Sequence, residues 1–549
     1  MTLAVFLNAF LLLFLGMFRS CNVYDEGLIL TGAMRVAAGA VPYRDFYANY
    51  GPAQFYLLAG LFKLFGPSVL VERLLDLSFK AGIVAACFAW TAVYCRKSSA
   101  LLAAALCWTW LFTLIWYGSP LMPATLLSLA GSGLFLSAWV NGRSSRRLLA
   151  AGAVTGLIVL FRYYVGFGVL LAHLCFIVIN DFHGDGRSRL RLRNTALSAG
   201  QYLAGTAIVC TPPALIYLAV APLHNFVFDI ITYPREYYGH ARRLPFPGIP
   251  HSIDLLAVSN LVVYIPILAV GILLFFFFSE RDRPRPDAAS APASSIRHEH
   301  LDQFFLLFGL LILVFYGKGL VRVDPFQMFL SIAPSLIVLV VLSERLRPRN
   351  VLFRYAVAAT LLLTLLTTAA AGLGTAIKIF SRYHSSVLAE LVSPPGPASL
   401  RNLTSWCGVP NPLHTGLCFL VDPDHIKAIQ FIDTHTSPGD QLFVGLPHHD
   451  RIWANDILTY FATQRMPATR WYHFDPDLQT RADIQREMIH EIESEPVPYI
   501  LLDSQWENIR EPNDSSESSG VTLLDDFIRD NYQQVQSFGE MTVWQRESP

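Results

Sequence analysis

The chain has 549 residues, of which 53% are hydrophobic and only 15% are charged, and its mean hydropathy is +0.42. Soluble domains contain about 25% charged residues, so most of this surface cannot face water. The 41 lysine and arginine residues are balanced by 41 aspartate and glutamate residues, which excludes a nucleic-acid binder that acts through a general basic field. The composition therefore predicts a membrane protein.

Long apolar runs predict about eleven membrane-spanning helices. They lie near residues 3–18, 68–94, 98–115, 121–140, 148–161, 165–180, 196–221, 257–279, 303–316, 326–343 and 351–373. Several are shorter than the ~20 residues that a span ideally needs, so tilt or local thinning of the bilayer must compensate. The run at 52–66 lies between Pro52 and Gly66-Pro67 and fits an interfacial helix better than a span. Residues 1–20 have no basic region or typical cleavage site, which favours an uncleaved first span over a signal peptide.

The basic residues predict the orientation of these spans. Every second short loop is rich in arginine: Arg96-Lys97, then Arg143, Arg146 and Arg147, then 187–193, 281–297 and 345–349. Basic residues in short loops mark the cytoplasmic side of a membrane. We therefore expect a multi-pass protein of the plasma (inner) membrane, with a cytoplasmic N-terminus. The loops 19–67, 116–120, 162–164, 222–256 and 317–325 would lie outside, together with the C-terminal part of the chain.

The C-terminal part has the character of a soluble domain. Helical patterns at 424–435, 480–494 and 521–531 alternate with short apolar runs at 441–445 and 499–502. This alternation predicts a small α/β domain over residues 380–549, following a transmembrane domain over 1–379. Cys407 and Cys418 lie in this domain and would close a short loop, and our hypothesis is that they form a disulfide in an oxidising compartment.

Three carboxylates stand in the first external loop. Asp25 and Glu26 follow the first predicted span directly, and Asp45 lies further along the same loop. Carboxylates beside a membrane surface suit general-base work on a hydroxyl or the coordination of a divalent cation. A solvated loop in which Asp25 caps a helix would contain the same residues, and the spacing does not choose between these readings.

Cationic side chains stand in two later loops on the same predicted side. Arg162 separates two short apolar runs, and the loop 317–325 contains Lys318, Arg322 and Asp324. Guanidinium groups at the level of the lipid headgroups match phosphate oxygens. They also anchor helices by snorkelling, and Arg322 could pair internally with Asp324. Their convergence on one face of the membrane with Asp25 favours a functional site.

The sequence gives little reason to expect a bound metal. No Cys-x-x-Cys or Cys/His spacing typical of zinc sites occurs. His448-His449-Asp450 is more consistent with a polar loop, because adjacent histidines point in different directions and no third ligand is evident. A divalent cation at the carboxylates of the first loop is the one cofactor that the residues leave open.

Several segments resemble the bacterial integral-membrane glycosyltransferases of the GT-C superfamily, related to protein O-mannosyltransferases and aminoarabinose transferases. The segment VYDEGLILTGAMRVAAGAVPYRDFYANYGPAQFYLLAGLFKLFG, residues 23–66, resembles the first periplasmic loop of that family. RYYVGFGVLL at 162–171 and GLVRVDPFQMFLSIAP at 319–334 resemble later family segments. PGDQLFVGLPHHDRIWANDILTYFATQRMPATRWYHFDPDL at 438–478 and SSGVTLLDDFIRDNY at 518–532 resemble the periplasmic domain of one bacterial subgroup.

The resemblance implies transfer of a sugar from a polyprenyl-phosphate donor to a glycan, lipid or protein acceptor on the external face, with inversion at the anomeric carbon. It assigns Asp25 as the general base, with Glu26 and Asp45 as further catalytic candidates. Arg162, Arg322, Lys318 and Asp324 would form the site of the lipid phosphate.

The chain departs from the pattern of these relatives in two places. Gln327 stands where many relatives have a histidine, and the loop Tyr117-Gly118-Ser119-Pro120 has no acid where several branches place one. The missing acid argues against a metal-dependent mechanism. The residues do not identify the sugar, the acceptor, the length of the lipid or the oligomeric state.

Two other classes of protein remain alternatives. A transporter or flippase of lipid-linked sugars would have polar residues near the middle of its spans and, in many cases, inverted repeats. Lys80 in the second predicted span is the one such residue that we cannot assign from the sequence. A non-catalytic subunit for envelope assembly would instead use the external domain to bind a partner.

Overall fold

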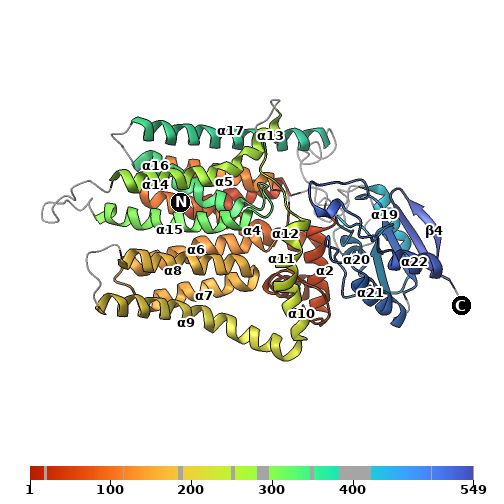
Figure 1. Cartoon of the computed structure of the whole chain (residues 1–549). Coiled ribbons are helices and arrows are strands. Elements are labelled where there is room, and N and C mark those ends of the chain that lie inside the picture. The colour runs from red at the N-terminus through yellow and green to blue at the C-terminus, as the bar shows by residue number, and fades with distance from the viewer. Residues whose placement is uncertain are drawn as a thin grey trace.

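The computed structural model describes residues 1–17, 21–114, 116–182, 189–248, 254–280, 296–345, 351–382, 422–495 and 497–547. The predicted pair of Cys407 and Cys418 lies outside these residues. The chain forms a bundle of long helices and a separate C-terminal α/β domain at one end of it (Figure 1). The predicted fold class, a helical membrane protein with a small C-terminal α/β domain, is thus confirmed.

Each of the eleven predicted spans is helical. The long helices are α1 (Thr2–Leu15), α4 (Val69–Tyr94), α5 (Lys97–Thr113), α6 (Leu121–Val140), α7 (Ser145–Phe161), α8 (Tyr163–Phe182), α9 (Arg189–Val220), α13 (Leu255–Asn260) continuing into α14 (Ile265–Glu280), α15 (Ile296–Gly319), α16 (Phe329–Arg345) and α17 (Val351–Arg382). Among the described residues, seven of these segments are long and apolar enough to cross a membrane. The remaining four, α1, α5, α7 and α16, have 14 to 17 residues, so their crossing stays a prediction.

Shorter helices lie between the bundle and the domain. They are α2 (Asp25–Ala37), α3 (Ala53–Phe65), α10 (Leu223–Val227), a π-helical turn (Phe228–Thr232), α11 (Tyr233–Glu236) and α12 (Tyr238–Ala241). The run predicted to be interfacial forms α3, a short apolar helix that leaves Tyr56, Leu64 and Phe65 exposed. Helix α2 instead lies against the C-terminal domain, since Thr31 donates to the carbonyl of Ile457 at 3.1 Å and Tyr472 donates to that of Leu28 at 3.2 Å.

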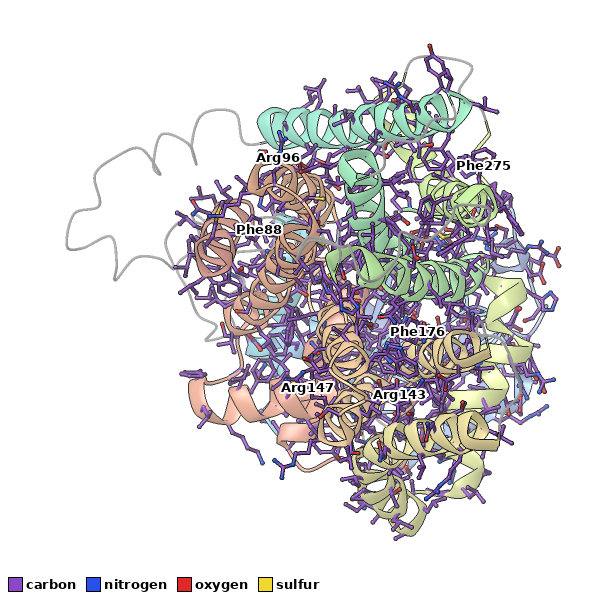
Figure 2. The ribbon with its side chains drawn as sticks, turned by 90° about the vertical axis from the view of Figure 1, so that its left-hand side faces the viewer. Phe88, Arg96, Arg143, Arg147, Phe176 and Phe275 are labelled. Carbon is purple, nitrogen blue, oxygen red and sulfur yellow. The ribbon has the colours of Figure 1, made fainter. Side chains whose placement is uncertain are left out.

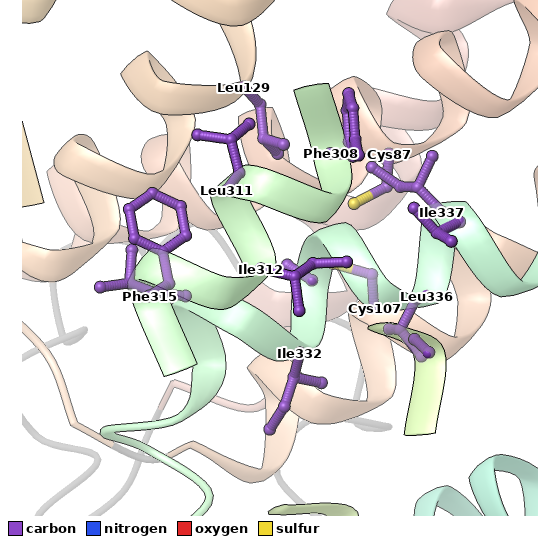
Figure 3. Close-up of a cluster of buried hydrophobic side chains, with 14 of the residues drawn as sticks. Cys87, Cys107, Leu129, Phe308, Leu311, Ile312, Phe315, Ile332, Leu336 and Ile337 are labelled. Atoms are coloured by element: carbon purple, nitrogen blue, oxygen red, sulfur yellow. The ribbon is translucent and has the colours of Figure 1, made fainter. Parts of the chain in front are cut away.

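The bundle packs closely where small residues allow it. A cluster of apolar side chains from α4, α5, α6, α15 and α16, including Cys87, Cys107 and Phe308, fills its centre (Figure 3). Helix α7 carries Gly152 and Gly156 four residues apart, and a Cβ atom at Gly152 would come within 2.0 Å of the carbonyl oxygen of Tyr202 on α9. Such small-x-x-x-small pairs are how helices approach one another in lipid, where apolar burial supplies little driving force.

The arginines of the first two basic loops lie at the end of the bundle away from the C-terminal domain. Arg96, Arg143 and Arg147 lie on that end (Figure 2). Arg143 pairs with Asp181 at the end of α8, and the backbone N–H of Arg96 donates to Glu344 at the end of α16 at 2.9 Å. The two basic loops that the structure describes in full therefore lie at one physical end of the molecule.

The C-terminal domain is a five-stranded sheet with helices. Its described elements are α19 (Pro423–His435), β1 (Gln441–Gly445), α20 (Leu458–Thr463), β2 (Met466–Pro467), α21 (Ala482–Ser494), β3 (Tyr499–Asp503), a 3-10 turn (Asp514–Ser516), α22 (Leu523–Asn531), β4 (Tyr532–Phe538) and β5 (Met541–Arg546). The strand order is β2-β1-β3-β5-β4. Strands β2, β1 and β3 are parallel to one another, whereas β5 is antiparallel to both of its neighbours, β3 and β4. The carboxyl ends of β1, β2 and β3 thus meet at one edge of the sheet.

Candidate active site

A cavity of about 1070 Å³ lies between the helical bundle and the C-terminal domain. Its lining includes four of the residues predicted from the sequence, Asp25, Arg162, Lys318 and Arg322. These four come from three separate loops and are brought together by the fold. The C-terminal domain contributes a second wall, from the segments that follow its parallel strands, the start of α19 and the turn before β5.

Asp25 is the first residue of α2 and is half-buried in the cavity wall. The Asn22 side chain fixes it from both sides: its amide nitrogen donates to Oδ2 of Asp25 at 3.1 Å, and its oxygen accepts from the Asp25 backbone N–H at 2.8 Å. Burial raises the pKa of Asp25 to about 6, although Arg242 and Asn22 oppose the shift. A carboxylate with this pKa is ionised at pH 7 and can still accept a proton readily.

A second carboxylate, Asp475, reaches the cavity from the C-terminal domain. It accepts hydrogen bonds from the Tyr24 hydroxyl at 3.0 Å and from the Asn49 amide at 3.1 Å, and it pairs with Arg242 at 3.3 Å. Burial acts to raise the pKa of Asp475, but His473, Arg242 and Tyr24 together hold it below its ordinary value. The two carboxylates therefore differ, because Asp475 stays charged and bonded while Asp25 is poised to take a proton.

Arg162 and Lys318 form a cationic corner around Tyr164. The Nε of Arg162 donates to the Tyr164 hydroxyl at 2.6 Å, and its guanidinium lies 4.0 Å from the ring centre of Tyr50. Lys318 lies 4.5 Å from the ring centre of Tyr164 and donates to Gln327 at 2.6 Å. The Nη1 atom of Arg162 is buried and has no hydrogen-bond acceptor among the described residues. The corner thus holds two cations on aromatic rings in the cavity lining.

Arg322 is more fully occupied than the other cations. Its two terminal nitrogens each donate to Glu511 at 2.8 Å, and its Nε lies 3.3 Å from Asp324. Burial acts to raise the pKa of Glu511, but Arg322 and Asn513 lower it to about 2. Asp324 does not line the cavity and instead accepts from the backbone N–H of Gln327 at 2.9 Å. The internal pairing of Arg322 and Asp324, an open alternative in the sequence, is therefore present.

Glu26 and Asp45 lie outside the cavity lining. Glu26 is fully buried and forms two hydrogen bonds with Arg73, at 2.7 and 2.9 Å. Asp45 pairs with its neighbour Arg44 near the surface and accepts from the backbone N–H of Val41 at 2.7 Å. The catalytic roles predicted for these two residues stay predictions, and their positions do not support them.

Sequence reasoning missed two residues of the site, Arg242 and Asp475. Arg242 follows α12 inside a loop predicted to be external, and a cation in a loop on that side is the feature that singled out Arg162. The same argument could have found it. Asp475 stands in a polar stretch of a domain with many acids, and only the fold brings it next to Tyr24, 451 residues earlier in the chain.

Two observations from the sequence are explained by the geometry. Lys80 pairs with Asp76 at 2.8 Å, one turn earlier on α4, and donates to the carbonyl of Trp116 at 3.0 Å. His449 is buried against Asp525 at 2.6 Å, whereas His448 is exposed near Glu507, so adjacent histidines do face different ways. Among the described residues, no group of three or more His, Cys, Asp or Glu side chains is arranged to hold a metal ion.

Comparison with solved structures identifies the fold. The chain is similar to ArnT from Cupriavidus metallidurans in the apo state, with a TM-score of 0.54 and 12% identity over 99% of this chain and 97% of that one. The same enzyme bound to undecaprenyl phosphate gives a TM-score of 0.52 at 14% identity, with the same coverage. The archaeal oligosaccharyltransferase AglB from Archaeoglobus fulgidus, in complex with an inhibitory peptide and a dolichol-phosphate, gives 0.46 at 14% identity over 92% of this chain and 70% of that one.

No protein-family model matches the sequence, and no curated protein shows significant similarity to it. The structural likeness to ArnT extends over nearly the whole of both chains. The chain therefore shares the fold of ArnT, which agrees with the fold that the resemblance found in the sequence implies.

Proposed function

We propose that the protein is a membrane glycosyltransferase that moves a sugar from a polyprenyl-phosphate donor to a hydroxyl acceptor. The observation that carries the proposal is the shared cavity, with Asp25 on one side and the cationic corner of Arg162 and Lys318 on another. The ArnT structure with undecaprenyl phosphate supports the donor class, since that neighbour has the same fold.

The reaction follows from these two features. An acceptor hydroxyl oxygen attacks the anomeric carbon of the donor, a new C–O bond forms, and the C–O bond to the lipid phosphate breaks. Asp25 takes the proton of the hydroxyl, and Arg162 and Lys318 stabilise the negative charge that develops on the departing phosphate. A single displacement of this kind inverts the anomeric centre. Because the lipid chain cannot enter water, the reaction belongs at the end of the bundle, beside the membrane surface.

The remaining predicted residues receive supporting roles. Arg322 would bind the phosphate only after it leaves Glu511, and Asp324 would orient Arg322. Glu26 would act through Arg73 by anchoring the start of α2, and Asp45 would stabilise the loop before α3. A divalent cation is not part of this mechanism.

We further propose that the cavity opens on the extracytoplasmic side of the plasma membrane. The support is that Arg96, Arg143 and Arg147 lie at the end of the bundle away from the C-terminal domain, whose residues line the cavity (Figures 1 and 2). In this orientation the N-terminus is cytoplasmic and residues 380–549 are extracytoplasmic. Cysteine labelling of intact cells at Asp530 would test it, since a residue on the cytoplasmic side stays unlabelled by an impermeant maleimide.

The function is tested by a transfer assay with purified protein in lipid, a radiolabelled polyprenyl-phosphate sugar and a cell-envelope extract as acceptor. Wild-type protein should form a labelled product, and Asp25→Asn should lose at least a hundredfold in rate while remaining folded. Asp530→Asn, the same chemical change at an exposed position on α22, is the matched control. Movement of the donor across the bilayer without transfer would instead identify a flippase. If the protein showed neither transfer nor movement of the donor, the non-catalytic assembly subunit would be the remaining alternative.

A further inference from the structure

Apart from Asp25 on the transmembrane side and His425 on the domain side, the charged residues that line the cavity are sorted between its two walls. The four lining lysine and arginine residues, Arg162, Arg242, Lys318 and Arg322, belong to the transmembrane part of the chain. The lining carboxylates of the C-terminal domain are Asp422, Asp475, Asp503 and Glu540. Among the described lining residues, the domain contributes no lysine or arginine. Arg242 and Asp475 pair across the two walls, and the remaining charges favour an anionic ligand at the transmembrane wall over the domain wall.

The domain wall is the carboxyl edge of the parallel strands. Trp453 lies in the loop that follows β1, and Asp503, Gln505 and Trp506 lie at the end of β3 and directly after it. Glu540 lies in the turn before β5. Its backbone carbonyl accepts a hydrogen bond from the Ser504 backbone N–H at 3.0 Å. In open α/β sheets, ligands bind in the crevice outside the carboxyl ends of the strands. Here that crevice opens into the membrane cavity.

The side chains on this edge combine flat aromatic surfaces with hydroxyl-binding groups. Trp453 and Trp506 are both half-buried at the wall, and each indole offers an apolar face. Asp503 accepts from the Gln505 backbone N–H at 3.0 Å and also from its side-chain amide. Burial and the neighbouring Asp456 raise the pKa of Asp503 to about 7, so this carboxyl can either donate or accept a hydrogen bond near neutral pH.

We propose that this edge is the acceptor subsite, and that the acceptor is an uncharged or amine-bearing carbohydrate. A sugar ring has an apolar C–H face, which packs on indole, and a rim of hydroxyls, which carboxyl and amide groups bind. An anionic glycan or a phosphorylated lipid headgroup would meet the carboxylates of the same wall and be disfavoured. The inference rests on the proposed transfer reaction and specifies its acceptor class.

Binding of defined oligosaccharides to the full-length protein in detergent tests the inference without needing transfer. Isothermal titration with cellotetraose, chitosan tetrasaccharide, tetragalacturonate and a serine-rich peptide covers neutral, cationic, anionic and peptide acceptors. We expect cellotetraose or chitosan tetrasaccharide to bind at least tenfold more tightly than tetragalacturonate. Trp506→Ala and the conservative Asp503→Asn should each weaken that binding about tenfold or more.

Charge removal sharpens the test. Glu540→Gln should improve binding of tetragalacturonate, whereas Glu493→Gln, the same change at an exposed position on α21, should leave every affinity unchanged. The inference is overturned if none of the four probes binds, if the anionic sugar or the peptide binds most tightly, or if the Trp506 and Asp503 variants bind as wild type. Transfer without binding of neutral or cationic sugars would refute this inference alone, and sugar binding without any transfer would refute the proposed function alone.

Discussion

Two arginines near the same end of the bundle, Arg73 and Arg162, are bound in opposite ways. Arg73 is fully buried and saturated: Glu26 accepts two of its hydrogen bonds, the carbonyl of Met17 accepts a third at 2.5 Å, and the ring of Tyr117 lies 4.4 Å away. Arg162 faces the cavity on two tyrosine rings and has a buried nitrogen without an acceptor in the described part of the chain.

The difference separates a structural charge from a binding charge. A buried ion pair whose partners are all present holds two segments together, here α4 and the start of α2, and has no capacity left for a ligand. A cation that lies on aromatic rings, with no carboxylate paired to it, keeps its full positive charge and can bind a phosphate. The sequence shows two arginines beside apolar runs and does not distinguish these states.

The largest effect should come from breaking the saturated pair. Arg73→Met leaves the Glu26 carboxylate buried without its partner, which costs about 3–5 kcal/mol. We expect the variant to be recovered in low yield, with a clearly lower thermal midpoint in detergent. The double variant Arg73→Met with Glu26→Leu removes both charges and should recover most of the loss. If the single variant were as stable as wild type, the pair would not anchor α2.

Removing the open cation should affect activity instead of stability. Arg162→Ala loses a donor to the departing phosphate, and the loss of one such donor typically costs about 10²–10³ in rate. The thermal midpoint should stay close to that of Arg529→Ala, a control at an exposed arginine on α22. Transfer by Arg162→Ala at the wild-type rate would show that the aromatic cradle serves folding alone.

Arg73 and Arg162 also show which features of the fold and the site could be predicted from the sequence. The spans, their orientation pattern and the α/β domain follow from apolar runs and arginine-rich loops, which are local signals. Asp25, Arg162, Lys318 and Arg322 were predicted because charges beside a membrane are costly. The pairing of Glu26 with Arg73, and of Arg322 with Glu511 189 residues later, depends on tertiary packing that no local pattern encodes. Asp475 was missed for the same reason.

The pH dependence of transfer tests the role of Asp25 more finely. The base must be ionised, so with a pKa of about 6 activity should be nearly full at pH 7 and fall about tenfold by pH 5. Arg242 lowers this pKa, so Arg242→Gln should move the acid limb of the profile to higher pH. The measurement is kcat/KM for the donor from pH 5 to pH 8. An unchanged limb in that variant would show that another group titrates.

The smallest predicted effect concerns Arg322, which lines the cavity but is already paired with a carboxylate. Glu511 occupies both arms of the Arg322 fork, the geometry that a phosphate would also use, so the donor must compete with this carboxylate. Glu511→Gln keeps the shape of the side chain but removes its charge, and should lower KM for the polyprenyl-phosphate donor severalfold. Glu517→Gln, an exposed neighbour, should not change KM. A higher KM in Glu511→Gln would mean that Glu511 positions Arg322 for the donor, and that Arg322 is held in its working conformation before the lipid arrives.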